Sequence, residues 1–234
     1  MLLPLCLDLS QKRVVIFGGG EVGERKAELF SQYAKVTVVS KAFSPRIQEM
    51  GKEGSVDLVR ADFSASEADE HLRGAFMIVP ATNDKKLNRS LEKKARKMNV
   101  LVNRVDGVGE VVVPSIIRRD PVVVSISTVG KSPALSRYLR LKLEKDLDQK
   151  YAEMALLLGE VRKDLKKTVS DQGSRKRIVW EIISDEEVWR LLEESYEKAY
   201  KRAGEHLIPD ERDSLDDGDS PEGGDRRDRT GLAW

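Results

Sequence analysis

Three glycines near the N-terminus stand at a spacing typical of dinucleotide-binding turns. They are Gly18, Gly20 and Gly23, and the apolar run from Val14 to Phe17 comes directly before them. In such a turn the first glycine permits the bend, the second lets backbone approach a pyrophosphate, and the third lets a helix pack closely on a strand. The phosphates would lie at the N-terminus of the helix that opens at about Glu21, where free N–H groups favour an anion. The sequence therefore predicts a dinucleotide cofactor.

Two further segments, each at the end of a predicted strand, extend this cofactor site. A dinucleotide site usually has an acid after its second strand, where it binds ribose hydroxyls. This chain has Ser40 and Lys41 there, and Lys41 is either a partner for a 2′-phosphate or a solvated lysine. The segment from Thr82 to Asp84 follows the fourth predicted strand, and we expect it both to face the cofactor and to cap the next helix. The predicted cofactor-binding residues are Gly18, Gly20, Glu21, Val22, Gly23, Ser40, Lys41, Thr82, Asn83 and Asp84.

Asp106 is the candidate acid–base residue. It directly follows the fifth predicted strand, on the rim where cofactor and substrate would meet. A carboxylate there is suited to accept a proton when a hydride leaves for a nicotinamide. An ordinary turn at Asp106 and Gly107 is the alternative interpretation. The histidines, His71 and His206, are predicted to be surface residues, and with one cysteine they cannot supply a zinc site of the usual spacing.

Basic side chains gather around Asp106. Within forty residues lie Arg104, Arg118, Arg119, Lys131, Arg137, Arg140 and Lys142, and hydroxyls come from Ser127, Thr128 and Ser132. The whole chain has a net charge of only +1. A local concentration of cations in a nearly neutral protein indicates a polycarboxylate or polyphosphate ligand. For Lys142 a solvated helix face is the stronger interpretation.

The composition excludes several other classes of protein. Of 234 residues, 40% are hydrophobic, which is sufficient for a core, and the net charge gives no global field toward nucleic acid or a membrane. The one cysteine, Cys6, excludes an intrachain disulfide framework. We find neither a signal peptide nor an apolar run near the roughly 20 residues that span a bilayer. We therefore expect a cytoplasmic protein without nucleic-acid or membrane partners.

The first half of the chain alternates between strand and helix patterns, which predicts an α/β fold. The fold expected is a Rossmann-like parallel sheet with helices on both faces, preceded by an edge strand or extended arm at Leu2 to Leu9. The predicted strands are Val14–Phe17, Lys35–Ser40, Ser55–Arg60, Ala75–Val79 and Val100–Asn103. The predicted helices are Glu21–Tyr33, Pro45–Met50 with Ser44 as its cap, Ala65–Leu72 and Lys85–Lys97.

The second half of the chain has a different pattern. Two apolar strands, Val111–Ile117 and Pro121–Ser127, cannot stand alone in water and need either the main sheet or a second copy of the chain. A helix is predicted from Ala134 to Lys150, and helices then continue from Tyr151 to His206. We expect a break near Gly173, a core that includes Trp180, Trp189 and Leu192, and a disordered tail. The predicted boundaries are 1–113 for the cofactor domain, 114–149 for a small α+β dimerisation and substrate region, 150–209 for a helical domain, and 210–234 for the tail.

Five segments together resemble one known family, the precorrin-2 dehydrogenases of siroheme biosynthesis. The order and spacing of all five match over roughly residues 1 to 205. They are Gly18-Gly19-Gly20-Glu21-Val22-Gly23-Glu24-Arg25-Lys26, Ala81-Thr82-Asn83-Asp84 with Asn88, Asn103-Arg104-Val105-Asp106, Val113-Pro114-Ser115-Ile116-Ile117-Arg118, and Ser127-Thr128-Val129-Gly130-Lys131-Ser132-Pro133-Ala134. Some members have serine where this chain has Thr128, which keeps the hydroxyl.

The resemblance implies an NAD-dependent oxidation of precorrin-2 to sirohydrochlorin. In some members Fe²⁺ is then inserted at the same site to give siroheme, so a ferrochelatase activity is a second expectation. The functional aspartate of the family falls on Asp106, as proton acceptor, and the family forms homodimers. The substrate carries eight carboxylates, which accounts for the cations. The implied substrate-binding residues are Asn103, Arg104, Ser115, Arg118, Ser127, Thr128, Lys131, Ser132 and Arg137.

Two other functions fit parts of the same sequence. A non-enzymatic NAD(H) sensor would use the glycine turn and the amphipathic C-terminal helices, but would not need Asp106 or Arg104. A protein that is mainly a sirohydrochlorin metal chelatase would need the Asp106 region. Methyltransferase activity is not expected from this chain.

Overall fold

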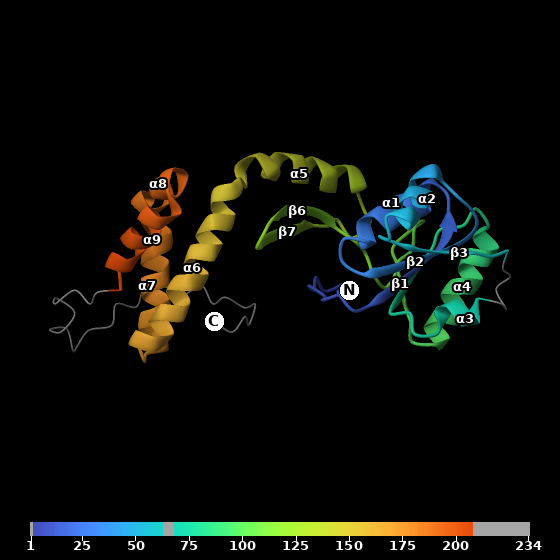
Figure 1. Cartoon of the computed structure of the whole chain (residues 1–234), viewed down its shortest axis with the longest axis horizontal. Helices are drawn as coiled ribbons and strands as arrows, with labels where there is room; N and C mark the ends of the chain where they lie inside the picture. The colour runs from blue at the N-terminus through green and yellow to red at the C-terminus, as the bar shows by residue number, and fades with distance from the viewer. Residues whose placement is uncertain (1, 63–67, 208–234) are drawn as a thin grey trace. The chain divides into compact units, whose positions relative to one another are not determined.

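The computed structural model describes residues 2–62 and 68–207, and the first half of the chain forms a five-stranded parallel sheet (Figure 1). The strand order is β3-β2-β1-β4-β5, and all four neighbouring pairs are parallel. The strands are β1 (Arg13–Gly19), β2 (Lys35–Phe43), β3 (Asp57–Arg60), β4 (Met77–Pro80) and β5 (Leu101–Val102). This order, with β1 at the centre and crossovers on both sides of it, confirms the predicted Rossmann-like fold.

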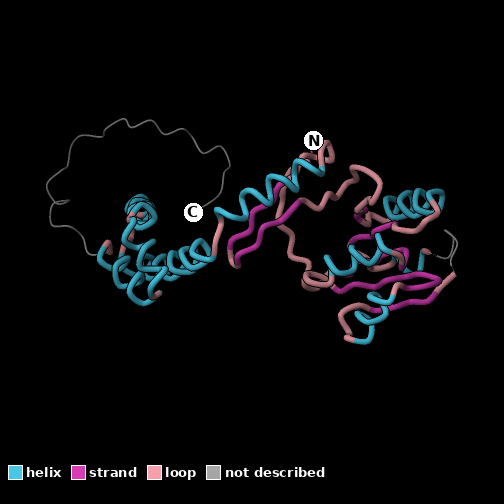
Figure 2. The backbone as a smooth tube through the Cα atoms, turned by 90° about the horizontal axis from the view of Figure 1, so that it is seen from above, coloured by secondary structure: helices cyan, strands magenta, loops and turns pink. Residues whose placement is uncertain are grey.

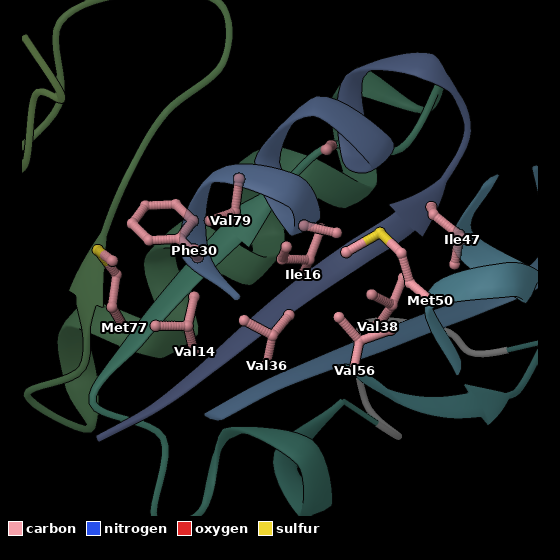
Figure 3. Packing of buried hydrophobic residues seen from close by; sticks show 12 residues of the cluster. Val14, Ile16, Phe30, Val36, Val38, Ile47, Met50, Val56, Met77 and Val79 are labelled. Carbon is pink, nitrogen blue, oxygen red and sulfur yellow. The ribbon is translucent and has the colours of Figure 1, made fainter. Parts of the chain in front are cut away.

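Helices cover both faces of this sheet because successive side chains of β1 point to opposite sides. Val14 and Ile16 pack in one buried cluster with α1 (Glu21–Phe30) and α2 (Pro45–Lys52), which Figure 3 shows from close by. Val15 and Phe17 pack on the other face with α3 (Asp69–Leu72) and α4 (Lys85–Lys97). Each fully buried aliphatic side chain contributes about 1.5–3 kcal/mol. The two faces together hold β1 and its glycine turn in place.

Several predicted boundaries of the first half need correction. Residues 2–9 lie outside any strand, and Leu3 and Leu5 are exposed, so the edge-strand interpretation of this segment is wrong. Helix α4 has the predicted bounds, because Asp84 caps its start. Helix α3 begins at Asp69 rather than Ala65, and residues 65–67 of that prediction lie outside the described residues.

The two apolar strands of the second half pair with each other. They are β6 (Ser115–Arg119) and β7 (Val122–Ile126), which form a separate two-stranded sheet within the described residues. The prediction that the first of them starts at Val111 is wrong. Val111 makes only an isolated parallel bridge to Asn103, and Pro114, which has no N–H to donate, precedes β6.

Helices form the rest of the described chain, and Figure 2 shows them in cyan. They are α5 (Pro133–Asp146), α6 (Gln149–Thr168), α7 (Gln172–Ser184), α8 (Glu186–Glu194) and α9 (Tyr196–Glu205). The predicted helix to Lys150 ends earlier because Asp148 caps α6 and accepts the Lys150 N–H. The break expected at Gly173 comes earlier, because Asp171 caps α7 and leaves Gly173 in its first turn.

The helices α6 to α9 share one buried cluster. Leu192 is buried there, and half-buried Trp189 packs against the cluster and donates its indole N–H to the Ile183 carbonyl. The prediction that Trp180 belongs to the core is wrong, since 50% of it is exposed. Asp185 caps α8 and also contacts Arg202 and His206, each at 2.9 Å. This carboxylate joins the start of α8 to the end of α9.

The chain divides into two compact units. One contains Met1–Ser115 and Ser127–Arg137, and the other contains Ile116–Ile126 and the described residues from Tyr138 onward. The predicted tail from residue 210 lies outside the described residues. Across residues 2–62 and 68–207, helices of the length and apolarity that a bilayer crossing requires are absent.

Candidate active site

A cavity of about 790 Å³ opens at the carboxyl ends of β1, β2 and β4. It brings together nine of the ten predicted cofactor-binding residues, all except Gly23. The lining residues are Gly18, Gly19, Gly20, Glu21, Val22, Val39, Ser40, Lys41, Ala42, Phe43, Ser44, Ala81, Thr82, Asn83, Asp84 and Leu87. In an open parallel sheet this edge, where the strand order reverses, is where ligands bind.

The glycine turn is tight enough to exclude side chains at two positions. Gly18 has a φ of +118°, and a Cβ placed on it would lie 2.4 Å from the Ala81 carbonyl oxygen. Gly23 does not line the cavity, but its Cβ would lie 2.0 Å from the Gly18 carbonyl oxygen. The first glycine therefore makes the bend and the third lets α1 approach β1, as the sequence predicts.

Gly20 is the residue where the cavity is open to a ligand. A Cβ built on it meets no described atom within 4 Å, although Gly20 itself lines the cavity. Gly20 is also the N-cap of α1, and no side chain of the described residues caps this helix start. The first N–H groups of α1 are therefore available to an anion at this end of the helix. These features fit the pyrophosphate of a dinucleotide.

Ser40 and Lys41 both have partners within the protein. The Ser40 hydroxyl accepts a hydrogen bond from the Gly19 N–H at 3.0 Å and ties the end of β2 to the glycine turn. The Lys41 ammonium lies 2.6 Å from the Asp62 carboxylate, and both side chains are largely exposed. A 2′-phosphate would have to compete with Asp62 for Lys41.

The segment from Thr82 to Asp84 has both predicted features. Asp84 caps α4 by accepting the N–H groups of Lys86 and Leu87, and all three residues of the segment line the cavity. Asn88 holds Thr82 from two sides, with its amide oxygen 2.6 Å from the Thr82 hydroxyl and its NH₂ donating to the Thr82 carbonyl. This arrangement fixes the part of the cavity wall that Thr82 forms.

The Asp106 carboxylate lies in the loop that follows β5, next to a guanidinium. Arg104 Nη2 donates to Asp106 Oδ1 at 3.1 Å, and Arg104 Nε lies 3.3 Å from Glu92 Oε1 of α4. About half of the Asp106 side chain is exposed, so the carboxylate is accessible to a substrate. Asp106 does not line the dinucleotide cavity, but the two belong to the same unit and follow carboxyl ends of strands in one sheet.

Asn103 is occupied by the protein itself. Its amide oxygen accepts from Lys26 Nζ at 2.8 Å, and its NH₂ donates to the Val111 carbonyl. Burial lowers the pKa of Lys26, and the neighbouring Arg25 lowers it further. Asn103 is only 2% exposed and connects α1, β5 and the segment after β5.

The predicted hydroxyl segment lies beside the Asp106 loop. A Cβ on Gly130, whose φ is +75°, would meet Val108 at 2.3 Å, so the two loops touch. The Thr128 hydroxyl accepts the N–H of Ser132 in its own loop at 3.0 Å and lies 3.1 Å from the hydroxyl of Ser136 in helix α5. Thr128 therefore builds the loop.

For the other predicted substrate-binding residues, the structure gives the segment and the unit in which each lies. Lys131 and Arg137 are exposed in the segment of the first unit that contains Thr128, where Ser127 Oγ accepts the Val129 N–H. Ser115 ends the first unit at the start of β6. Arg118 belongs to the second unit and lies 2.7 Å from Asp120. The structure therefore gathers Arg104, Asp106 and the loop from Ser127 to Ser132 in one unit.

Two contributors to the site are not evident from the sequence pattern. Glu92 is buried on an otherwise basic helix, and only its packing reveals its contact with Arg104. Phe43 and Ser44 line the cavity because β2 continues to Phe43, three residues beyond its predicted end. The regular spacing of apolar residues stops at Val39, so no pattern signals this extension.

Comparison with known proteins identifies the family of this chain. The family described as "Putative NAD(P)-binding" matches residues 5–115, which include the glycine turn and Asp106. A precorrin-2 dehydrogenase from Methanosarcina barkeri (strain Fusaro / DSM 804) is 47% identical over 204 residues, covering 86% of this chain and 91% of that protein. The chain belongs to the precorrin-2 dehydrogenase family. The confirmed predictions are the family and its dinucleotide-binding domain.

Other members of the family are longer or more distant. Siroheme synthase 1 from Serratia proteamaculans (strain 568) is 36% identical over 182 residues, and the match covers 76% of this chain but only 37% of that protein. The solved structure of SirC, a precorrin-2 dehydrogenase, is 26% identical and superimposes with a TM-score of 0.68 over 87% of this chain and 100% of that one. The likeness to SirC shows that the fold extends beyond the NAD(P)-binding domain.

Proposed function

We propose that this chain oxidises precorrin-2 to sirohydrochlorin with NAD⁺. The observation that carries the proposal is the pairing, within one unit, of a dinucleotide cavity with an accessible carboxylate held by an arginine. The family relationship supports the same reaction, since the relative that matches over most of both chains is named a precorrin-2 dehydrogenase.

The oxidation removes a hydride and a proton from the tetrapyrrole. When bound, the nicotinamide supplies the hydride acceptor. The proton passes to one oxygen of Asp106, while Arg104 holds the other oxygen and so orients the carboxylate. A positioned general base of this kind contributes typically about 10²–10⁴-fold in rate.

The substrate would be recognised mainly through its carboxylates. Lys131 and Arg137 are exposed in the unit that contains Asp106, and they are the first candidates to bind acidic side chains of precorrin-2. Asn103, Ser127 and Thr128 have partners within the protein, which supports a role in shaping the site. Direct contacts by Ser115, Ser132 and Arg118, and the domain boundaries given above, stay predictions.

NAD⁺ is the proposed form of the cofactor rather than NADP⁺. Lys41, which stands where a 2′-phosphate would lie, already contacts Asp62 at 2.6 Å. The nearby negative charge of Asp62 would repel a phosphate and compete for the lysine. NAD⁺ has no 2′-phosphate, so its binding does not depend on displacing Asp62 from Lys41.

We further propose that the chain works as a homodimer. The β6–β7 sheet has two strands, and such a pair is marginal in water without a partner. Large apolar side chains are exposed in and after it, namely Val123, Leu135, Tyr138, Leu141 and Leu143. A second copy of the chain would bury them. Leu141→Glu should convert the dimer to monomer in sedimentation analysis, whereas Met98→Glu, at a comparably exposed position after α4, should leave the dimer intact.

Iron insertion is a second candidate activity. Siroheme synthases match this chain over most of its length, although the chain spans less than half of theirs. Fe²⁺ would act as a substrate, and Asp106 would take the pyrrole protons that the metal displaces. The same site would then serve both steps.

One assay tests these proposals in sequence. Purified protein is mixed with precorrin-2 and either NAD⁺ or NADP⁺, and NADH formation and the sirohydrochlorin spectrum are followed. Turnover with NAD⁺ supports the dehydrogenase, whereas NAD(H) binding without turnover or tetrapyrrole affinity would instead indicate a sensor. Fe²⁺ is added last, and metal insertion faster than the uncatalysed control would establish the chelatase.

A further inference from the structure

Glu92 is an unusual residue in its helix. The helix α4 carries seven cations and this one acid, and the acid is buried together with Leu91 and Ala95. The residue is 9% exposed. Removing a carboxylate from water is unfavourable by several kcal/mol unless a charge partner compensates. The buried Glu92 carboxylate therefore needs a positively charged side chain beside it.

That partner is Arg104, the residue that holds Asp106. Glu92 Oε1 lies 3.3 Å from Arg104 Nε, and Nη2 of the same guanidinium donates to Asp106 Oδ1 at 3.1 Å. The Arg104 Nε is shielded from solvent and has no hydrogen-bond partner in the described part of the chain. The contact with Glu92 is thus an ion pair of opposite charges rather than an aligned hydrogen bond.

The stem of Arg104 is also confined. A Cβ on Gly109 would lie 3.0 Å from Arg104 Cγ, so the backbone of the loop packs directly on the side chain. With its stem packed and its Nε beside a buried carboxylate, the guanidinium has few alternative orientations. In the orientation that the structure shows, Arg104 Nη2 donates to Asp106.

We propose that Glu92 is a positioning residue for the acid–base group of this site, acting on Asp106 through Arg104. This inference rests on the proposed function, because it takes Asp106 as the proton acceptor. Glu92 does not line the cavity, and its ion pair is with Arg104 rather than with Asp106. Its effect on the reaction therefore depends on Arg104 being present.

A double-mutant cycle tests this dependence. Glu92→Gln keeps the shape but removes the charge, and should lower kcat about 10- to 100-fold, the effect of misplacing a catalytic group by about 1 Å. The dissociation constant for NAD⁺ should not change. In a protein that already carries Arg104→Gln, adding Glu92→Gln should change kcat less than about twofold. Losses that multiply in the double variant would overturn the proposal.

A matched control removes a neighbouring acid that also pairs with an arginine. Glu110 is exposed, and its ion pair, at 2.9 Å, is with Arg96 of α4. Glu110→Gln should leave kcat unchanged, and an equal loss there would contradict a specific role for Glu92. If Glu92→Gln does not fold, Glu92→Met replaces the buried charge with an apolar chain of similar length, and the same cycle applies.

A second readout does not depend on turnover. In ¹⁵N spectra of the full chain with labelled arginine, the Arg104 Nε–H should exchange slowly with water and should exchange at least about tenfold faster in Glu92→Gln. Unchanged exchange would overturn the contact on which the inference depends. Wild-type protein that shows this protection but no turnover would refute the proposed function alone.

Discussion

Two alanine substitutions in the glycine turn should separate folding from cofactor binding. In Gly23→Ala the new Cβ would start 2.0 Å from the Gly18 carbonyl oxygen, so α1 and the turn must move apart by at least about 1 Å. In Gly20→Ala the Cβ meets no described atom within 4 Å, but it stands beside the cavity. The first change should therefore affect both the stability of the protein and cofactor binding, and the second should affect mainly cofactor binding.

The expected magnitudes follow from these contacts. Overpacking of this kind lowers the free energy of unfolding by about 1–3 kcal/mol, so Gly23→Ala should lower Tm by about 2–12 °C. Gly20→Ala loses only the slight preference for glycine over alanine at an N-cap, less than about 1 kcal/mol. Both should raise the Kd for NAD⁺ at least about tenfold, which corresponds to about 1.4 kcal/mol.

Thermal unfolding and isothermal titration with NAD⁺ measure the two effects on the same samples. Gly159→Ala in the middle of α6 is the control, because its Cβ also meets open space and alanine favours a helix by about 0.5–1 kcal/mol. It should keep wild-type affinity for NAD⁺. Wild-type affinity in Gly20→Ala would refute the placement of the pyrophosphate, and an undiminished Tm in Gly23→Ala would refute the packing argument.

Three other predictions concern single carboxylates. Asp106→Asn should retain the fold and lose about 10²–10⁴-fold in kcat in the NADH assay; near-wild-type turnover would remove Asp106 from the mechanism. Asp62→Asn should tighten NADP⁺ binding about two- to fivefold by freeing Lys41, with NAD⁺ binding unchanged, and titration of both nucleotides checks this. Burial raises the pKa of Asp185, but its hydrogen bonds, first that with His206, outweigh burial and hold the pKa below the ordinary value of an aspartate. Its contribution to stability is therefore complete above about pH 3.9 and is lost as pH falls through the lowered value. Urea unfolding of Asp185→Asn should lack that acid loss, and an unchanged pH dependence would show that other groups cause it.

The sequence alone predicts the parts of this protein that depend on local geometry. The order of strands and helices in the first half follows from runs of apolar residues interrupted by glycine and by capping residues such as Ser44 and Asp84. The cofactor cavity follows as well, because a glycine turn after a buried strand can pack in few ways. The motif around Asp106 indicates the family, and comparison confirms it.

Helix ends in the second half were harder to predict. Asp148 and Asp171 each restart a helix within a long, evenly polar stretch, and aspartate is also common inside and between helices. Residue type alone does not predict burial, since Trp180, an aromatic residue in a helix, is 50% exposed. Its burial depends on which face of α7 meets α6, and that face is decided only when the helices pack.

The residues and their spacing by themselves predicted a dinucleotide site at Gly18 to Gly23 and a candidate acid–base group at Asp106. Tertiary structure decided how that group is held. Lys26 reaches Asn103 across 77 positions of the chain, and Glu92 meets Arg104 from a helix on one face of the sheet. These pairs depend on where two elements come to lie against each other. No local pattern of residues carries that information, because the contact exists only once the sheet has assembled.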